Sequence, residues 1–405
     1  MSNLKKILIG IALLVIVGGA GYGVYYVFFK APAPEVVAPV ANVNAPVGGA
    51  LPGAGPAGAR PTVPTGGTGV GLQASPIARG GFTLSPVVVN TPTLGATLTA
   101  DGSGLNFYDR ATGQFFRVNP DGSLTQLSAD AFPQAQNVTW SSNGARVVLE
   151  FPDGSKIAYD FNAQRQATLP KSWEDFSFSP DSNQIAAKSV GDSPDANWLV
   201  VSDADGNNPR VVNELGDNSD KVQVSWSPTG EVIALSQTGD PVGGGGKQVL
   251  FVGQNGENFK SVISPGLAFT PNWSPDGSRM LFSAAAVDDD WKPRISIVDA
   301  QGDNIGGERR AIDLYTTADK CTWANAGTVY CAVPDYMPDG AGLQLNVLDG
   351  TPDAVYRVDT TTGAITLVGR PESDATMERL SVSPDGSILY FVDQTYGTIK
   401  KMQLK

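Results

Sequence analysis

The sequence predicts an all-β protein: a seven-bladed β-propeller of four-stranded blades, preceded by one transmembrane helix and a disordered linker. Three observations lead to this prediction. A long apolar segment stands near the N-terminus, a stretch rich in proline, alanine and glycine follows it, and a short turn motif then recurs through the rest of the chain. The composition agrees, because 47 glycines, 29 prolines and only 17% charged residues are typical of turn-rich β-structure and linkers.

The apolar segment, Ile7–Phe29, contains no charged residue. As a helix it would be about 35 Å long, which is enough to cross a bilayer. Lys5 and Lys6 precede it and Lys30 alone follows, so we expect residues 1–6 in the cytoplasm and the remainder in the periplasm or outside the cell. The alternative is a cleaved signal peptide, whose apolar core is usually about 7–15 residues. The greater length favours an uncleaved signal anchor.

Two features accompany this predicted anchor. Gly19 and Gly23 form a GxxxG spacing that would let two membrane helices approach closely, which predicts a weak homodimer; glycine is also simply common in membrane helices. Residues 30–80 carry almost no charge, and their frequent prolines and glycines disfavour helix and strand. We expect them to form a disordered stalk that reaches on the order of 40 Å from the membrane.

The recurring motif is a short turn built on Ser-Pro-Asp-Gly or a relative, preceded by an apolar or aromatic residue and followed by an apolar strand. Proline pre-sets φ, aspartate bonds to the following backbone, and glycine accepts positive φ, so each copy is expected to close a hairpin. The preceding aromatic residue is expected to fill the gap between neighbouring sheets. The copies are Thr139–Gly144, Ser177–Ser182, Ser225–Gly230, Asn272–Gly277, Thr322–Gly327 and Ser381–Gly386, with a weaker one at Leu98–Ser103.

A second hairpin follows each copy, which gives four strands per unit at a spacing of about 40–60 residues, the period of propeller blades. The repeat resembles the TolB-type WD-like β-propeller family, whose consensus is aromatic–Ser–Pro–Asp–Gly. The resemblance covers about residues 95–405 and implies a membrane-anchored bacterial member without the amino-terminal domain of TolB. The propeller is therefore expected to span residues 81–405.

The ring needs one further strand, because the last unit ends after its third strand, Thr398–Leu404. Phe82–Asn90 reads as an unassigned strand ahead of the first unit. We expect it to complete the last blade, which would remove the exposed edge of an open ring.

Long second turns in units three to six predict a working face. The first and third turns of a blade lie on one face of a propeller, and the second turns lie on the other. The insertions Ser189–Asn197, Gln237–Lys247, Ala284–Pro293 and Pro334–Asp353 should therefore rise together, and long loops on a rigid scaffold often carry function. The predicted partner-binding residues are Asp192, Asp195, Asp240, Asp288, Asp289, Asp290, Trp291, Asp335, Tyr336, Met337 and Asp339.

Aromatic anchors ringed by acidic residues suit a basic or mixed protein segment. The alternative is that acidic loops merely keep the protein soluble. Cys321 and Cys331 flank one hairpin symmetrically around Ala326, so antiparallel pairing would bring them within disulfide range; two buried thiols are the alternative.

Other chemistry is largely excluded. The chain contains no histidine, which removes Ser–His–Asp and Cys–His sites and histidine metal ligands. Asp203–Asn207 resembles the start of a calcium loop but lacks the glutamate at its twelfth position, and it is expected to be a hairpin turn. No cofactor, metal site or catalytic residue is predicted. The net charge of −12 makes nucleic-acid binding unfavourable.

The sequence therefore predicts a binding or scaffold module that contacts a protein or glycan of the cell envelope, and not an enzyme. Two alternatives stay open. One is a carboxylate-dependent glycosidase or lyase with paired aspartates in the propeller mouth. The other is a sensor or accessory subunit of a larger envelope assembly.

Overall fold

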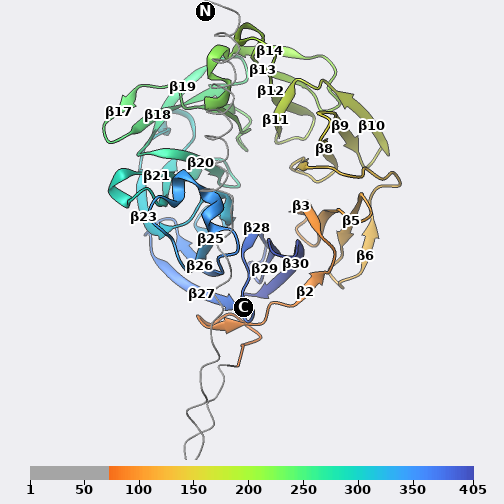
Figure 1. The fold of residues 1–405 in the computed structure, drawn as a ribbon, viewed down its shortest axis with the longest axis vertical. Helices are drawn as coiled ribbons and strands as arrows, with labels where there is room; N and C mark the ends of the chain where they lie inside the picture. Colours follow the sequence, from red (N-terminus) through yellow and green to blue (C-terminus); the bar gives the residue numbers. More distant parts are fainter. Residues whose placement is uncertain (1–72) are drawn as a thin grey trace, which may run out of the picture. The chain divides into compact units, whose positions relative to one another are not determined.

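The computed structural model describes residues 73–405, and they form a ring of seven β-sheets around a central axis (Figure 1). The predicted seven-bladed propeller of four-stranded blades is confirmed. The predicted membrane span Ile7–Phe29 and the stalk up to residue 72 lie outside the described residues. No helix among residues 73–405 has the length and hydropathy that crossing a bilayer requires.

The first three blades each consist of four antiparallel strands in chain order, from the axis outward. Blade 1 contains β3 (Thr93–Leu98), β4 (Leu105–Asp109), β5 (Gln114–Val118) and β6 (Leu124–Gln126). Blade 2 contains β7 (Asn137–Trp140), β8 (Arg146–Glu150), β9 (Lys156–Asp160) and β10 (Arg165–Leu169). Blade 3 contains β11 (Trp173–Phe178), β12 (Gln184–Ser189), β13 (Trp198–Asp203) and β14 (Arg210–Glu214).

The next blades follow the same plan, and blades 4 and 6 each gain a short fifth strand. Blade 4 contains β15 (Val222–Val224), β16 (Val232–Ser236), β18 (Gly246–Gly253) and β19 (Asn258–Ser264), with β17 (Pro241–Val242) paired to the start of β18. Blade 5 contains β20 (Leu267–Trp273), β21 (Arg279–Ala285), β22 (Pro293–Asp299) and β23 (Arg310–Tyr315). Blade 6 contains β24 (Cys321–Asn325), β25 (Thr328–Pro334), β26 (Asp353–Asp359) and β27 (Ile365–Pro371), with β1 (Phe82–Thr83) at its outer edge.

Short 3₁₀ helices interrupt the connections between strands. They are η1 (Pro194–Ala196), η2 (Gly216–Lys221), η3 (Val287–Asp289), η4 (Gly302–Asn304), η5 (Ala318–Lys320), η6 (Ala341–Leu343) and η7 (Leu345–Leu348).

The ring closes in blade 7, which joins the two ends of the propeller. Blade 7 contains β28 (Met377–Val382), β29 (Ile388–Asp393), β30 (Thr398–Gln403) and β2 (Val87–Val89). Figure 1 shows β2 beside β30, and Val89 is the register partner of Ile399. The expected closing strand is thus present.

The predicted strand Phe82–Asn90 is nevertheless shorter and divided, which corrects its expected bounds. Its first part, β1, runs parallel to β27 in blade 6. Pro86, which has no backbone N–H, separates the two parts, and Ser85 donates from both N and Oγ to Glu372, at 2.6 and 2.7 Å. The chain also joins the propeller before residue 81: Ala78 N donates to the carbonyl of Gln403 (2.9 Å), so residues 73–80 belong to the ring rather than to the stalk.

Each first turn is locked by its own side chains, as blade 5 illustrates. The Ser274 hydroxyl donates to Oδ1 of Asp276 (2.7 Å) and accepts from the N–H of Arg279 (2.9 Å). Gly277 follows with φ of +69°, a value that glycine adopts without strain. Hydroxyl-to-carboxylate bonds of this kind recur in other first turns, namely Thr99–Asp101, Ser179–Asp181 and Ser383–Asp385. In two of them, the hydroxyl and backbone donors hold the pKa of the carboxyl at about 2, in Asp101 and Asp385.

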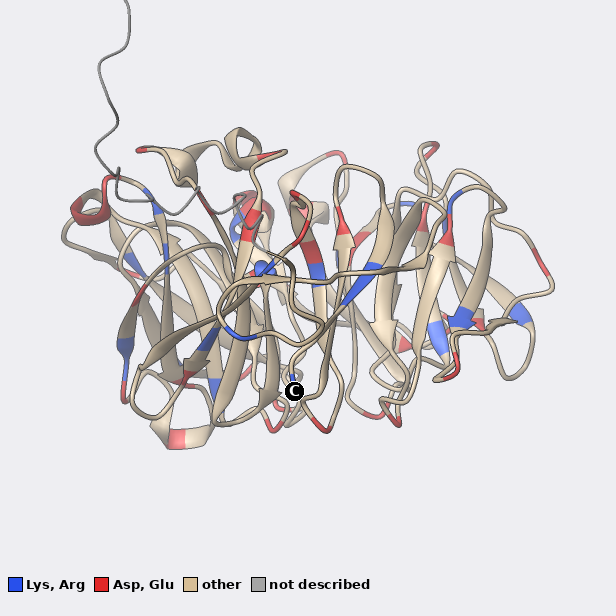
Figure 2. Ribbon diagram, turned by 90° about the horizontal axis from the view of Figure 1, so that it is seen from below, with Lys and Arg blue, Asp and Glu red and all other residues tan. Residues whose placement is uncertain are grey.

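The hydrophobic core is divided into seven clusters, one in each seam between neighbouring blades. Tryptophans near the end of the inner strands reach across these seams, as predicted. The indole N–H of Trp273 in blade 5 donates to Ser225 Oγ of blade 4 (2.9 Å), and that of Trp323 in blade 6 donates to the carbonyl of Asn272 in blade 5 (3.3 Å). Every blade is therefore buried on both faces by its two neighbours. Figure 2 shows the ring from the side, with acidic residues at turns along both edges.

We predict that Ser274→Ala lowers the free energy of unfolding by about 1–3 kcal/mol, because it removes the buried Ser274 hydroxyl and leaves the part-buried N–H of Arg279 without its acceptor. Urea denaturation of the full-length protein, followed by tryptophan fluorescence, measures the change. Ser278→Ala is the matched control, since its hydroxyl also bonds Asp276 but in an exposed position; it should change stability by less than about 0.5 kcal/mol. Equal effects of the two changes would contradict this account of the turn.

We predict that Val89→Lys destabilises the protein by about 3 kcal/mol, because it places an unpaired ammonium in the seam that closes the ring. Val87 lies two residues earlier on the same strand but is 48% exposed, so Val87→Lys should shift stability by less than about 0.5 kcal/mol. The same urea titration compares them. A small effect of Val89→Lys would show that β2 does not close the ring.

Candidate functional site: the loop face

The four inserted loops lie on the edge of the ring that carries the second turns, which we call the loop face. They join the second and third strands of blades 3, 4, 5 and 6, where the expected insertions Ser189–Asn197, Gln237–Lys247, Ala284–Pro293 and Pro334–Asp353 fall. The second and third strands beneath them pair antiparallel in all four blades.

The insertion of blade 6 folds back onto that of blade 5. Gly340 N donates to the carbonyl of Asp290, and Gly342 N donates to the carbonyl of Trp291, both at 2.8 Å. Lys292 Nζ lies 2.7 Å from Asp339, whose carboxylate raises the pKa of this lysine. The two insertions therefore form one unit.

Several predicted acidic residues in this unit already have partners within the chain. Asp289 accepts from Arg294 Nη1 and from the Tyr315 hydroxyl, both at 3.2 Å. Asp335 pairs with Arg370 of β27. The side chain of Asp289 is only 15% exposed, so its main role is to hold the loops in place.

The other predicted residues divide into exposed and covered ones. Tyr336 is 69% exposed, whereas Trp291 and Met337 are half-buried. The acidic residues with open surfaces are Asp192, Asp195, Asp240, Asp288, Asp290 and Asp339. Asp192, Asp195 and Asp240 belong to blades 3 and 4, and no hydrogen bond or ion pair among residues 73–405 joins them to the unit of blades 5 and 6.

Sequence reasoning missed the apolar component of this face. Of the large apolar side chains that residues 73–405 leave exposed, more than half lie on the loop face of blades 5–7. These are Leu267, Val287, Tyr336, Leu343, Leu345, Val347 and Tyr396, which we call the apolar patch. Exposed apolar groups gathered in one region commonly mark an interaction surface. A signal was present in the run Leu343-Gln344-Leu345-Asn346-Val347-Leu348, which places four large apolar residues within the predicted inserted loop Pro334–Asp353.

A cavity of about 360 Å³ lies between η7 and the inner strand of blade 7. Leu345 and Leu348 supply its apolar side, while Asp319, Glu378 and Arg379 supply charge. Asp319, Glu378 and Arg379 form no ion pair within the described part of the chain. The cavity thus joins the apolar patch to uncompensated charges of both signs.

Arg379 also lines a second cavity, of about 530 Å³, along the inner strands. The only carboxylate in this cavity's lining is Asp175, which accepts from Val224 N (2.8 Å) and lies 3.5 Å from Lys188. Burial raises the pKa of Asp175. A glycosidase of the usual kind needs two carboxyl groups, and this cavity offers one.

A buried ion pair anchors the blade 6 insertion beside the first cavity. Lys320 Nζ lies 2.8 and 2.7 Å from the two carboxylate oxygens of Asp353, which also accepts from Met377 N of blade 7 (2.6 Å). The Asp353 side chain is fully buried, and this burial raises its pKa. The pair thus holds together η5, β26 of blade 6 and β28 of blade 7 at the point where the blade 6 insertion ends.

The two cysteines lie just below this anchor. Cys321 and Cys331 are register partners in β24 and β25, and the structure joins their sulfurs in a disulfide with a Cα–Cα distance of 4.0 Å. Both belong to the cluster in the seam between blades 5 and 6. The oxidising compartment that such a bond requires agrees with the predicted extracytoplasmic location, which stays a prediction.

We predict that Lys320→Met lowers the free energy of unfolding by about 3–5 kcal/mol, because it leaves the Asp353 carboxylate buried without a counterion. The loss should shrink as the pH falls, since the raised pKa of Asp353 lets it take up a proton in the folded protein before it does so in the unfolded chain. Urea titrations at neutral and acidic pH measure both effects. Lys320→Met combined with Asp353→Asn should recover most of the stability; a double variant no better than the single one would contradict the assignment.

Comparisons with known proteins identify the fold alone. No family model and no curated protein sequence matches the chain. An oligogalacturonate lyase solved in complex with manganese is 14% identical, with a TM-score of 0.56 over 79% of this chain and 91% of that one. The β-propeller domain of Cps50 (Swd1) from Myceliophteria thermophila is 11% identical, with a TM-score of 0.54 over 79% of this chain and 98% of that one. At this level of identity the two neighbours show the fold alone, so the chain is shown to be a β-propeller, and its TolB-type resemblance stays a prediction.

Proposed function

We propose that this protein is a membrane-tethered, extracytoplasmic binding module that holds a protein partner against the loop face of blades 5–7. The observation that carries the proposal is the apolar patch. Most of its members stand on the insertions of blades 5 and 6, namely Val287, Tyr336, Leu343, Leu345 and Val347. These two insertions are bonded to one another, and a buried ion pair anchors the blade 6 insertion, so this part of the surface is presented in one arrangement. A preformed surface binds with little ordering cost.

The chemistry of the partner follows from what surrounds the patch. Asp288, Asp290 and Asp339 are exposed around it, and the domain as a whole is acidic. Interfaces commonly combine an apolar centre with a charged rim. We therefore expect a partner segment with two or three apolar side chains flanked by lysine or arginine.

The carboxylate-based enzyme is the weaker alternative. Asp319 and Asp349, which line the 360 Å³ cavity, are exposed to solvent, and Glu378 in the same lining is half-buried. Asp353 is paired with Lys320. Catalytic acid–base pairs in glycosidases sit in enclosed sites that separate their pKa values. The neighbouring lyase has this fold and acts on oligogalacturonate, but a fold shared at 14% identity carries no site with it.

We predict that a photo-crosslinking amino acid at Tyr336 captures a discrete partner in the cells that make this protein. The combined change Leu345→Ser and Val347→Ser should reduce the yield of this adduct about tenfold, because two exposed anchor side chains are lost. Mass spectrometry of the adduct identifies the captured segment and tests whether it is apolar and basic.

The control places the same photoreactive group at Leu124, which is 53% exposed. Leu124 lies in β6, the outer strand of blade 1, outside the four insertions. It should yield no adduct that depends on Leu345 and Val347. An adduct formed equally at both positions, or one that the serine variant leaves unchanged, would refute the proposed binding face.

A further inference from the structure

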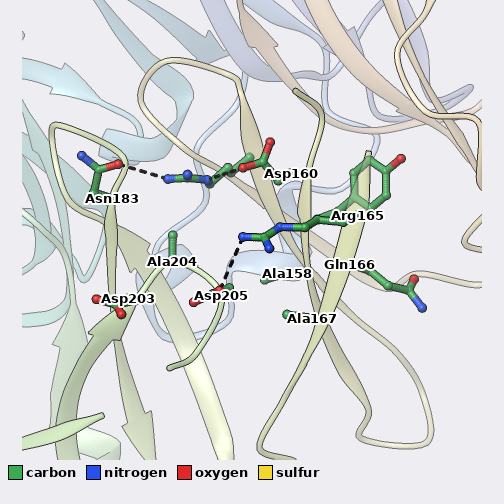
Figure 3. Close-up of a pocket in the computed structure, with 11 residues that line it drawn as sticks. Ala158, Asp160, Arg165, Gln166, Ala167, Asn183, Asp203, Ala204 and Asp205 are labelled. Carbon is green, nitrogen blue, oxygen red and sulfur yellow. Dashed lines mark hydrogen bonds and ion pairs between the residues drawn. The ribbon is translucent and has the colours of Figure 1, made fainter. Parts of the chain in front are cut away.

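A cavity of about 280 Å³ lies in the seam between blades 2 and 3, on the face that carries the first and third turns (Figure 3). This face is opposite to the loop face. The cavity draws on both blades: β9 and β10 line one side, and the turns beside β12 and β13 line the other. Nothing in the proposed function uses it.

Three other seams, those between blades 3 and 4, 4 and 5, and 5 and 6, are closed at this level by a basic side chain. Near the start of the outer strand in blades 3, 4 and 5, Arg210, Lys260 and Arg310 each donate to a backbone carbonyl in the third turn of the next blade. Their acceptors are the carbonyls of Gln254, Asp303 and Thr361. These bonds draw the outer parts of neighbouring blades together.

The seam between blades 2 and 3 departs from this pattern. Arg165 occupies the corresponding place at the start of β10, but its guanidinium lies 3.8 Å from Asp205, which is beyond hydrogen-bond distance, and its side chain is 68% exposed. The floor beneath it consists of Ala158, Ala167 and Ala204, whose small side chains leave the space unfilled. The cavity results from both departures.

Unusual backbone conformations surround the cavity and orient its polar groups. Ser182 (φ +62°) stands where other copies of the repeated turn have glycine, and its carbonyl accepts from Arg146 Nη1 (2.6 Å). Asn208 (φ +50°) donates from its side chain to Asp203 (2.8 Å). Positive φ is unfavourable for residues other than glycine, and such residues concentrate at functional sites.

The polar rim offers both donors and acceptors. Arg165 has donors that no hydrogen bond within the described chain uses, and one oxygen of Asp203 is free of the bond to Asn208. Three carboxylates, of Asp160, Asp203 and Asp205, stand against two guanidiniums, of Arg146 and Arg165, so the lining has a slight excess of negative charge. The cavity therefore disfavours an anion.

We propose that this cavity binds a neutral saccharide unit. Sugar hydroxyls both donate and accept, so one ring can donate to Asp203 and accept from Arg165. The C–H face of the ring would rest on the three alanines, which exclude water without adding polar groups. The volume lies near the lower end of the range for small-molecule sites, about 300–1,000 Å³, which suits one ring rather than a long oligosaccharide.

Saturation-transfer NMR on the full-length protein tests the proposal with glucose, galactose, mannose and N-acetylglucosamine, and with galacturonate as the anionic comparison. We expect at least one neutral sugar to bind and galacturonate to bind more weakly. Ala167→Phe should abolish binding by filling the floor, and Arg165→Ala should weaken it about tenfold. Asp303→Asn, in the third turn of blade 5, is the matched control and should leave binding unchanged.

Two further measurements distinguish the possible explanations of the binding results. An array of extended glycans distinguishes a terminal sugar of a glycan from a free monosaccharide. Near-ultraviolet circular dichroism checks that Ala167→Phe remains folded, so that loss of binding reports on the cavity. The absence of binding by every neutral sugar, preference for galacturonate, or unchanged binding by Ala167→Phe would each overturn the proposal. The variant with Leu345→Ser and Val347→Ser should retain sugar binding, which keeps this test independent of the loop face.

Discussion

The structure depends on closing the ring, because each blade is buried only by its two neighbours. The core is not one cluster but seven, and each lies in a seam between two sheets. Leaving one seam open would expose two apolar sheet faces and one unpaired strand edge. The protein closes the last seam by bringing β2, from the start of the propeller, into the final blade, where Val89 packs with Phe107 and Ile399. The pairing of the two ends of the propeller domain therefore stabilises every blade between them.

Most of the fold could be predicted from the sequence, because its decisive signals are local. A turn such as Ser274–Gly277 is held by bonds within six residues, so its residue types alone reveal it. The closing strand was predictable only in part. Val87–Val89 joins blade 7 as expected, whereas Phe82–Thr83 joins blade 6 through pairing with Arg370 and Pro371. No local sequence pattern indicates a pairing partner almost three hundred residues away. Glu372, which accepts hydrogen bonds from Ser85, is equally distant in the sequence.

The position of the candidate site could be predicted from the sequence, but the residues that it exposes could not. Chain order alone placed the four insertions on one face. Their contents depend on pairings between distant residues: Asp335 is taken by Arg370, and Asp289 by Arg294 and Tyr315, so carboxylates that looked available hold the loops instead. Conversely, Leu345 and Val347 lie in a sequence pattern typical of a strand, yet both are exposed on η7. Burial is a property of the assembled ring, and sequence periodicity reports it only where an element is regular.

Both proposed sites lie where the repeat is broken, and the physics of the ring explains why. In the three seams between blades 3 and 6, apolar side chains fill the inner part and a basic side chain from one blade bonds the third turn of the next, as Arg210 does with Gln254. Such a bond closes the seam on the face that carries the first and third turns. The proposed surface for a partner lies where insertions add material above the blades, and the proposed sugar cavity lies where the closing bond is missing, at Arg165 and Asp205. The strain at Ser182 and the unfilled space above Ala167 are tolerated because the six other seams keep the ring closed.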